Sequence, residues 1–257
     1  MTAYMDHKNL ANTDISDERR REIEDGVKVT LDRVHDAEHT AYRDEGSVTL
    51  LAATKTRDVG EILAAIDAGI RCIGENRPQE VLAKAEGLIA GFTERNLAIP
   101  FHMIGQLQAN KISKILPFID TVESVDSLKL AERIARRLDE HQTIGVLLEV
   151  NESGEDSKSG CKPEEAEELA YQIAAMPGLE LQGFMTIGTH VDDEKVVRSG
   201  FNHLRQLRDD ICASGVEGTQ GAQQLSMGMS ADMAWAIAEG ATIVRVGTGI
   251  FGQRAFI

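Results

Sequence analysis

At 257 residues with 42% hydrophobic content, the chain can bury the core of one large domain. Its net charge of −15 argues against general binding to nucleic acids or anionic membranes, both of which require a basic surface. The three cysteines are odd in number and show no CxxC spacing, which argues against a disulfide framework or a zinc site.

The N-terminal residues 1–16 lack the apolar core of a signal peptide, and no apolar run approaches the roughly 20 residues of a membrane span. We therefore expect a flexible tail over 1–16 and a cytoplasmic protein with reduced thiols. Ser16 or Asp17 can cap a helix that runs to about Tyr42, because apolar residues recur there at helical spacing.

Eight short apolar runs follow, and they alternate with helical stretches. The predicted strands are 48–54, 71–74, 101–104, 121–125, 144–150, 181–186, 224–226 and 242–246. The predicted helices are 58–68, 79–88, 127–141, one opened by Pro163, 194–214 and 231–237. Eight β/α units in about 250 residues are typical of a parallel barrel. We predict an α/β fold with a single (β/α)₈ barrel over 17–257, which includes an extra N-terminal helix.

Lys55 directly follows the first predicted strand. Active sites of such barrels lie at the carboxyl ends of the strands, and a partly desolvated lysine there can attack an aldehyde. A surface lysine at a strand end is the simpler alternative. The residues that follow the other strands decide between them.

The last two strands end in segments that suit an anion. Leu225-Ser-Met-Gly-Met-Ser230 precedes a helix, and Gly247-Thr248-Gly249 follows the final strand. Such loops supply hydroxyl and backbone N–H groups, and those after strands seven and eight often bind phosphate. Turns and helix caps would explain either segment alone, but the two together favour phosphate. Arg245, within the last strand, needs an acceptor, which is either a ligand or a neighbouring carboxylate.

Several segments resemble the YggS/PROSC family of pyridoxal 5′-phosphate (PLP) homeostasis proteins. The resemblance runs in order from about residue 20 to 257, and Phe101 and Gln106 stand where tryptophan and histidine are common in the family. The segments are Ala53-Thr-Lys55-Thr, Ile73-Gly-Glu-Asn76 with Gln79-Glu80, His102-Met-Ile-Gly105 with Leu107-Gln-Ala-Asn-Lys111, Lys158-Ser-Gly160, Leu225-Ser-Met-Gly-Met-Ser230, Val244-Arg-Val-Gly-Thr248 and Ile250-Phe-Gly252.

This resemblance implies a barrel like the N-terminal domain of alanine racemase, which is PLP fold type III. It implies that PLP is the cofactor and that Lys55 forms the internal aldimine. It further implies that Ser226, Gly247 and Thr248 hold the phosphate and that Arg245 faces the pyridine nitrogen. The residues that it implies around the rest of the cofactor are Asn76, Asn151 and Met227.

The family implies PLP buffering or delivery inside the cell, with PLP-dependent apo-enzymes as candidate partners. The alternative is a weak amino-acid racemase, which needs a second base. We expect little or no catalysis, because the three tyrosines lie in the tail or on predicted helices and the chain stops soon after the last strand. A monomer is expected, because the second domain that supplies the racemase dimer surface would be missing. No metal is expected, because no spacing of histidine and acidic residues suggests a metal site. A third possibility is an aldolase in which Lys55 works with Glu75 as its acid–base group.

Overall fold

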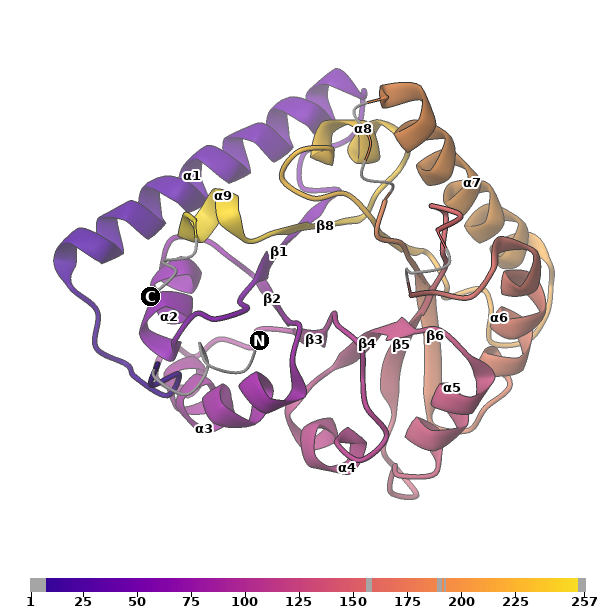
Figure 1. Cartoon of the computed structure of the whole chain (residues 1–257), viewed down its shortest axis with the longest axis horizontal. Coiled ribbons are helices and arrows are strands. Elements are labelled where there is room, and N and C mark those ends of the chain that lie inside the picture. Colours follow the sequence, from indigo (N-terminus) through magenta and orange to yellow (C-terminus); the bar gives the residue numbers. More distant parts are fainter. Residues whose placement is uncertain (1–7, 156–158, 189–190, 192, 254–257) are drawn as a thin grey trace.

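Eight parallel strands form a closed barrel in the computed structural model, which describes residues 8–155, 159–188, 191 and 193–253. The strands follow one another in chain order, and β1 pairs with β8 to close the ring (Figure 1). The predicted barrel is therefore confirmed. The strands are β1 (Thr49–Ala53), β2 (Cys72–Glu75), β3 (Phe101–Met103), β4 (Thr121–Val125), β5 (Ile144–Glu149), β6 (Leu179–Met185), β7 (Gln224–Ser226) and β8 (Ile243–Val246).

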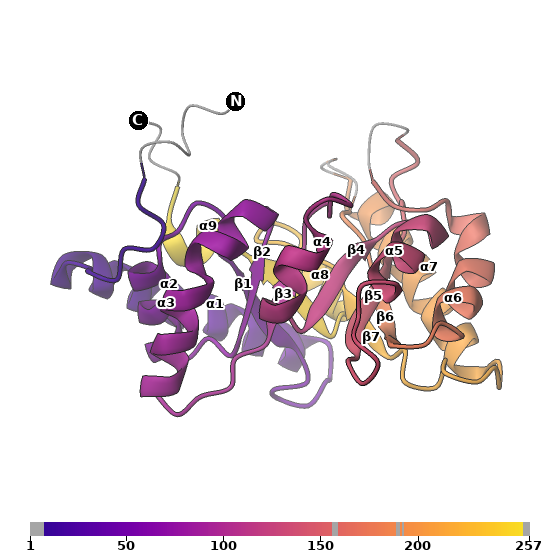
Figure 2. The ribbon, with the colours of Figure 1, turned by 90° about the horizontal axis from the view of Figure 1, so that it is seen from below.

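Helices cover the outer side of this barrel (Figures 1 and 2). The helix predicted for 79–88 extends to Glu94, and the one predicted for 127–141 ends at Ala135. The short helices over 112–118 were not predicted, since they span too few residues for a periodic pattern. The helices are α1 (Asp17–Thr40), α2 (Val59–Asp67), α3 (Pro78–Glu94), α4 (Ile112–Ile115), η1 (Leu116–Phe118), α5 (Leu128–Ala135), η2 (Pro163–Glu165), α6 (Ala166–Ala174), α7 (Glu194–Ala213), α8 (Met233–Ala238) and α9 (Thr248–Phe251).

Most strand residues are buried on both faces, and β4 and β5 are buried throughout, as expected for a parallel sheet covered by helices. Their outward side chains join the helices in one large apolar core. The inward ones form a separate small cluster of Leu51, Cys72, Ile104 and Ile243. Leu51 lies opposite Arg245 in the β1–β8 register, so this arginine also points into the barrel.

Ser16 caps the long helix α1, because its side chain accepts a hydrogen bond from the backbone N–H of Arg19. It packs closely against α9, at the end of the barrel strands. A Cβ on Gly26 would lie 2.3 Å from the carbonyl oxygen of Ile250, so only glycine permits this approach. The helix α1 therefore braces the segment that follows β8.

Of the expected tail 1–16, residues 1–7 lie outside the described residues. Residues 8–14 run along the start of α2, where the Val59 and Gly60 amides donate to the carbonyl oxygens of Leu10 and Asn12. The Lys8 ammonium lies 2.7 Å from a carboxylate oxygen of Glu61. This part of the tail thus makes specific contacts with the barrel. Within the described residues, no helix combines the length and apolar character that crossing a bilayer requires.

Candidate functional site

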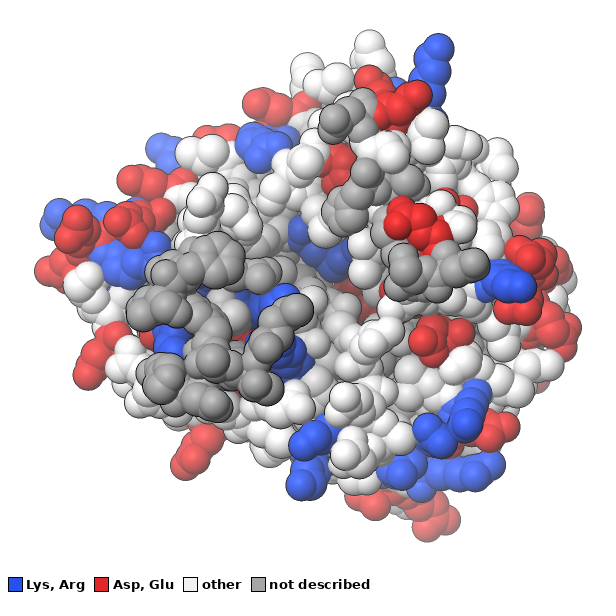
Figure 3. All heavy atoms as spheres, in the orientation of Figure 1, with Lys and Arg blue, Asp and Glu red and all other residues white. Residues whose placement is uncertain are grey.

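A pocket of about 400 Å³ opens at the carboxyl ends of the barrel strands. Lysine and arginine side chains gather around the central hollow of this face, in a protein that is acidic overall (Figure 3). The pocket is therefore a locally basic site suited to an anionic ligand. It is lined by Ala53, Lys55, Arg57, Asn76, Ile104, Ile187, Met229, Ser230, Ala231, Arg245, Gly247 and Thr248.

Five of the eight residues predicted for the site line this one pocket. They are Lys55, Asn76, Arg245, Gly247 and Thr248. They come from β1, β2 and β8 or from the residues directly after them, and β1 is the strand that joins β2 to β8 in the ring. The topology thus brings a lysine amine, an arginine and a glycine-rich segment to the same side of the barrel mouth.

The guanidinium of Arg245 is fixed from inside the barrel. One of its nitrogens donates to the hydroxyl and carbonyl oxygens of Ser226, both at 2.7 Å, and the other donates to the Thr186 carbonyl at 2.8 Å. A carboxylate oxygen of Glu123 lies 4.0 Å away. Burial is the larger effect and lowers the pKa of Arg245, although Glu123 and other carboxylates raise it. Arg245 thus has a structural carboxylate neighbour and also lines the pocket, so its contact with a ligand stays a prediction.

Glu123 stands at the centre of a buried polar network beneath the pocket. It lies 2.7 Å from the His102 ring and accepts a hydrogen bond of 2.6 Å from the Ser226 hydroxyl. Burial raises the pKa of Glu123, but His102 and Arg245 outweigh this effect and lower it. For His102, burial lowers the pKa, but contacts with Cys72 and Glu123 outweigh burial and raise it to about 10. Glu123 was not predicted from the sequence as part of the site, although a glutamate within the apolar run 121–125 indicates a buried charge that needs a partner.

Three predicted site residues lie elsewhere. Ser226 was expected to bind the phosphate. In the structure its hydroxyl is fully buried, donates to Glu123 and accepts from Arg245. Met227 is fully buried in the core. The Asn151 side chain accepts hydrogen bonds from the backbone and hydroxyl of Ser153, in the loop after β5. None of the three lines the pocket.

Arg57 and Ser230 also line the pocket. Arg57 was not predicted, and Ser230 was predicted only as part of the anion-binding segment 225–230, not as a named site residue. Arg57 donates to the Gly252 carbonyl at 3.0 Å and lies over the Phe251 ring. Ser230 ends the segment after β7, and its carbonyl accepts a hydrogen bond from Arg33 of α1. Within this segment Gly228 has φ +92°, a left-handed conformation that favours glycine. Their position in the sequence was the available signal: Arg57 lies two residues after Lys55, and Ser230 lies four residues after Ser226.

Glu75 does not supply an acid–base group to the pocket. Its carboxylate is fully buried behind the end of β2, where it pairs with Lys84 at 2.6 Å and accepts from the Thr54 hydroxyl at 2.9 Å. The aldolase alternative required this group beside Lys55. The geometry therefore disfavours it.

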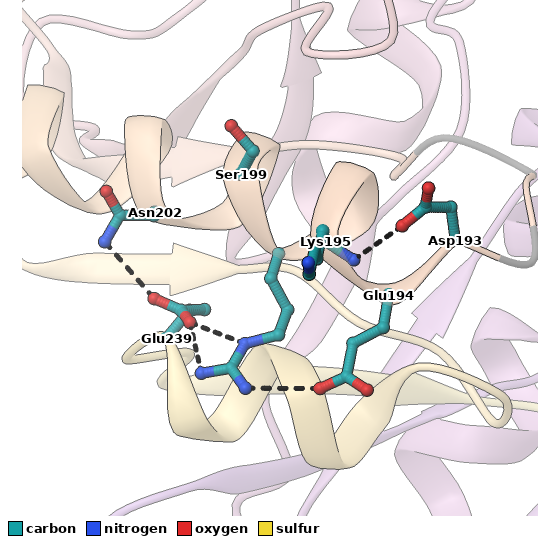
Figure 4. Close-up of a pocket in the computed structure, with 7 residues that line it drawn as sticks. Asp193, Glu194, Lys195, Ser199, Asn202 and Glu239 are labelled. Atoms are coloured by element: carbon teal, nitrogen blue, oxygen red, sulfur yellow. Dashed lines mark hydrogen bonds and ion pairs between the residues drawn. The ribbon is translucent and has the colours of Figure 1, made fainter.

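A larger hollow of about 1070 Å³ lies on the outer side of the barrel, along α7 and the end of α8 (Figure 4). Several of its polar side chains are paired with one another. Glu239 binds both Arg198, at 2.6 Å, and Asn202, at 3.2 Å, while Asp193 caps α7. Because these groups already pair, they do not converge on a ligand. Among the residues that the structure describes, no cluster of histidine, cysteine and carboxylate side chains could hold a metal ion.

Comparison with known proteins identifies the family. Residues 38–255 match the family model described as alanine racemase, N-terminal domain. The pyridoxal phosphate homeostasis protein of Pseudomonas aeruginosa is 38% identical over 235 residues, which cover 91% of this chain and 96% of that protein. The corresponding protein of Vibrio cholerae is also 38% identical, over 243 residues that cover 92% of this chain and 98% of that protein.

Solved structures agree with these matches. The crystal structure of an unknown protein from Bifidobacterium adolescentis is 62% identical, with a TM-score of 0.93, over 95% of this chain and 100% of that one. PipY of Synechococcus elongatus, solved with PLP bound, is 29% identical, with a TM-score of 0.68, over 85% of this chain and 100% of that one. The chain belongs to the family of pyridoxal phosphate homeostasis proteins, which are built on the barrel of the alanine racemase N-terminal domain.

Proposed function

We propose that this chain binds PLP reversibly through Lys55 and serves PLP homeostasis, by buffering or delivery, with little or no catalysis. The observation that carries the proposal is that Lys55, Arg245 and Thr248 line one pocket. Its volume of about 400 Å³ falls within the range of small-molecule sites, roughly 300–1,000 Å³. Relatives named as PLP homeostasis proteins and the PLP-bound PipY structure support the same cofactor.

The residues present fit the parts of PLP. A phosphate would accept hydrogen bonds from the Thr248 hydroxyl, from Ser230 and from the backbone N–H groups at Gly247 and Thr248, the first of α9. Asn76 would contact the ring or its substituents from the end of β2. Ser226 would act from below by holding Arg245, Met227 would support the segment after β7, and Asn151 would shape the loop after β5.

The proposed linkage is a Schiff base. Lys55 would hold PLP through a C=N bond between its amine nitrogen and the aldehyde carbon, with the aldehyde oxygen lost as water. An arginine only donates hydrogen bonds, so Arg245 facing the pyridine nitrogen would keep that nitrogen unprotonated. The ring is then a weaker electron sink than one paired with a carboxylic acid. This pairing favours holding the cofactor over carbanion chemistry.

The racemase alternative lacks a second base among the described tyrosines. Tyr42 is exposed just after α1, and Tyr171 donates to Glu167 on α6. Neither of them lines the pocket, and Tyr4 lies outside the described residues. The proposal therefore favours a carrier. It also includes a cytoplasmic monomer that passes PLP to dependent apo-enzymes.

The experiment follows the fate of bound PLP. The PLP-loaded protein is mixed with an apo-enzyme that requires PLP, and its recovered activity is measured beside chiral chromatography of L-alanine incubated with the protein alone. We expect activity to be restored and no D-alanine beyond background. Interconversion at an ordinary enzymatic rate, about 10 per second, would establish the racemase instead. Failure of the protein to bind PLP would refute both functions, and failure to release bound PLP would refute delivery.

A further inference from the structure

A buried ionic cluster lies directly behind Lys55. It consists of Glu75 from β2 and of Glu80 and Lys84 from α3, and all three side chains are fully buried. The Lys84 ammonium lies 2.6 Å from Glu75 and 2.9 Å from Glu80. We call these three residues the Lys84 cluster.

The Lys84 cluster binds the chain on both sides of Lys55. On one side, the Thr54 carbonyl accepts a hydrogen bond of 2.9 Å from Lys84, and the Thr54 hydroxyl donates to Glu75. On the other side, the Thr56 amide donates to Glu80 at 2.6 Å. The backbone of Lys55 is therefore held between two residues that are anchored to the same cluster.

Thr56 shows that this anchoring determines the backbone conformation. Its φ is +68°, a left-handed value that is unfavourable for a β-branched residue. Such conformations persist where surrounding structure over-determines them, and they concentrate at functional sites. Here the buried carboxylate of Glu80 holds the Thr56 amide. The strained residue is the immediate neighbour of Lys55.

The same cluster contacts a second pocket residue, because the backbone N–H of Asn76 donates to the Glu75 carboxylate at 2.8 Å. The ends of β1 and β2 at the pocket are thus fixed by one group of side chains. Stability alone does not explain this arrangement, since desolvation opposes the burial of two carboxylates and one ammonium, even with the Arg77 guanidinium 3.6 Å from Glu80. Burial raises the pKa of Glu75, Lys84 lowers it and Glu80 raises it further.

We propose that Glu75, Glu80 and Lys84 are positioning residues that hold the Lys55 loop in the conformation that presents its amine to the pocket. This inference rests on the proposed function of Lys55 and assigns three further residues to it. Lys84 would act only through Thr54 and the two glutamates. If the cluster only stabilised the barrel, substituting one of its residues would destabilise the whole protein evenly. If the cluster positions Lys55, the same substitution would impair the reaction of Lys55 before it weakens binding at the rest of the site.

The test compares Glu80→Ala with Glu80→Gln, which keeps an oxygen to accept from Thr56. The matched control is Glu38→Ala, because Glu38 is a buried carboxylate that accepts from the Val48 amide at the opposite end of β1. Two ligands separate the effects. PLP reports capture by Lys55, trapped with borohydride, and pyridoxine 5′-phosphate, which has no aldehyde, reports the phosphate and ring site.

We expect Glu80→Ala to slow PLP capture about tenfold or more, the loss for a buried charge-assisted hydrogen bond, with pyridoxine phosphate affinity kept. Glu80→Gln should restore most of the rate, and Glu38→Ala should leave it unchanged. Folded Glu80→Ala capturing PLP at the wild-type rate would overturn the proposal, as would equal slowing by Glu38→Ala.

A measurement on the protein without PLP keeps the two proposals separable. Hydrogen exchange of the Thr56 amide and reductive methylation of Lys55 by formaldehyde and cyanoborohydride need no cofactor. We expect Glu80→Ala to speed exchange at Thr56 and to change the methylation rate of Lys55, with Glu38→Ala without effect on either. If the wild-type protein fails to bind PLP, the proposed function fails, and these two rates still decide whether the Lys84 cluster positions Lys55. Unchanged rates in Glu80→Ala would refute it.

Discussion

Glu61 joins four segments at the rim of the pocket, and its removal should weaken the fold in a pH-dependent way. Its carboxylate binds Lys8 of the N-terminal segment at 2.7 Å, Arg19 of α1 at 2.7 Å and Arg57 of the Lys55 loop at 3.4 Å. The two arginines also donate to the Phe251 and Gly252 carbonyls, at the end of α9. Glu61→Gln keeps the shape of the side chain and removes its charge.

The magnitude follows from the pKa of Glu61. Burial raises this pKa, but Lys8 and the arginines outweigh burial and bring it from 4.5 to about 2. A carboxyl whose pKa is lowered by folding stabilises the protein above its unfolded pKa, and this stabilisation is lost as the pH falls through the folded pKa. The full shift would correspond to about 3 kcal/mol, and partial solvation of the partners reduces it to about 2 kcal/mol.

Urea unfolding of wild type and Glu61→Gln at pH 7 and pH 3 measures this effect. We expect a difference of about 2 kcal/mol at pH 7 and about 1 kcal/mol or less at pH 3, because most of the window between the two pKa values has then been crossed. Glu22→Gln is the control, since Glu22 pairs with the same Arg19 on the exposed surface and should cost under about 1 kcal/mol. An equal difference at both pH values would refute the ionic explanation.

Two further predictions concern the pocket and its surroundings. Thr248→Val removes a hydroxyl from the pocket and should weaken pyridoxine 5′-phosphate binding about tenfold by calorimetry, and unchanged affinity would exclude Thr248 from the phosphate site. Burial raises the pKa of Glu149 to about 7, so its ionised form destabilises the fold at higher pH. Glu149→Gln should therefore raise stability by about 2 kcal/mol at pH 8 and change it little at pH 4.5 in urea titrations, and a gain that did not depend on pH would contradict this account.

The barrel was predictable from the sequence because most strand residues are buried on both faces and most strands read as short aliphatic runs. The strands over 121–125 and 224–226 were predicted with the bounds that the structure gives. Helix ends were less accurate. The helix α3 continues to Glu94 because Leu88 and Gly91 still pack inward, which extends its buried face beyond the predicted end.

The site was predictable only in part, because the sequence shows which residues follow a strand but not which way each side chain turns. Lys55 and Thr248 follow their strands and line the pocket. Ser226 is the last residue of β7, and the alternation of the strand turns its hydroxyl inward to Glu123. The pairing of Glu123 with His102, from β3, depends on three-dimensional contact that no local pattern encodes.

The most direct test of the central claim is peptide mapping by mass spectrometry after the protein has been incubated with PLP and reduced with borohydride. The account predicts one pyridoxyl group per chain, located on Lys55, and none in the same peptide of Lys55→Ala. Modification spread over surface lysines with Lys55 unmodified would contradict it, and so would a protein that carries no pyridoxyl group after reduction.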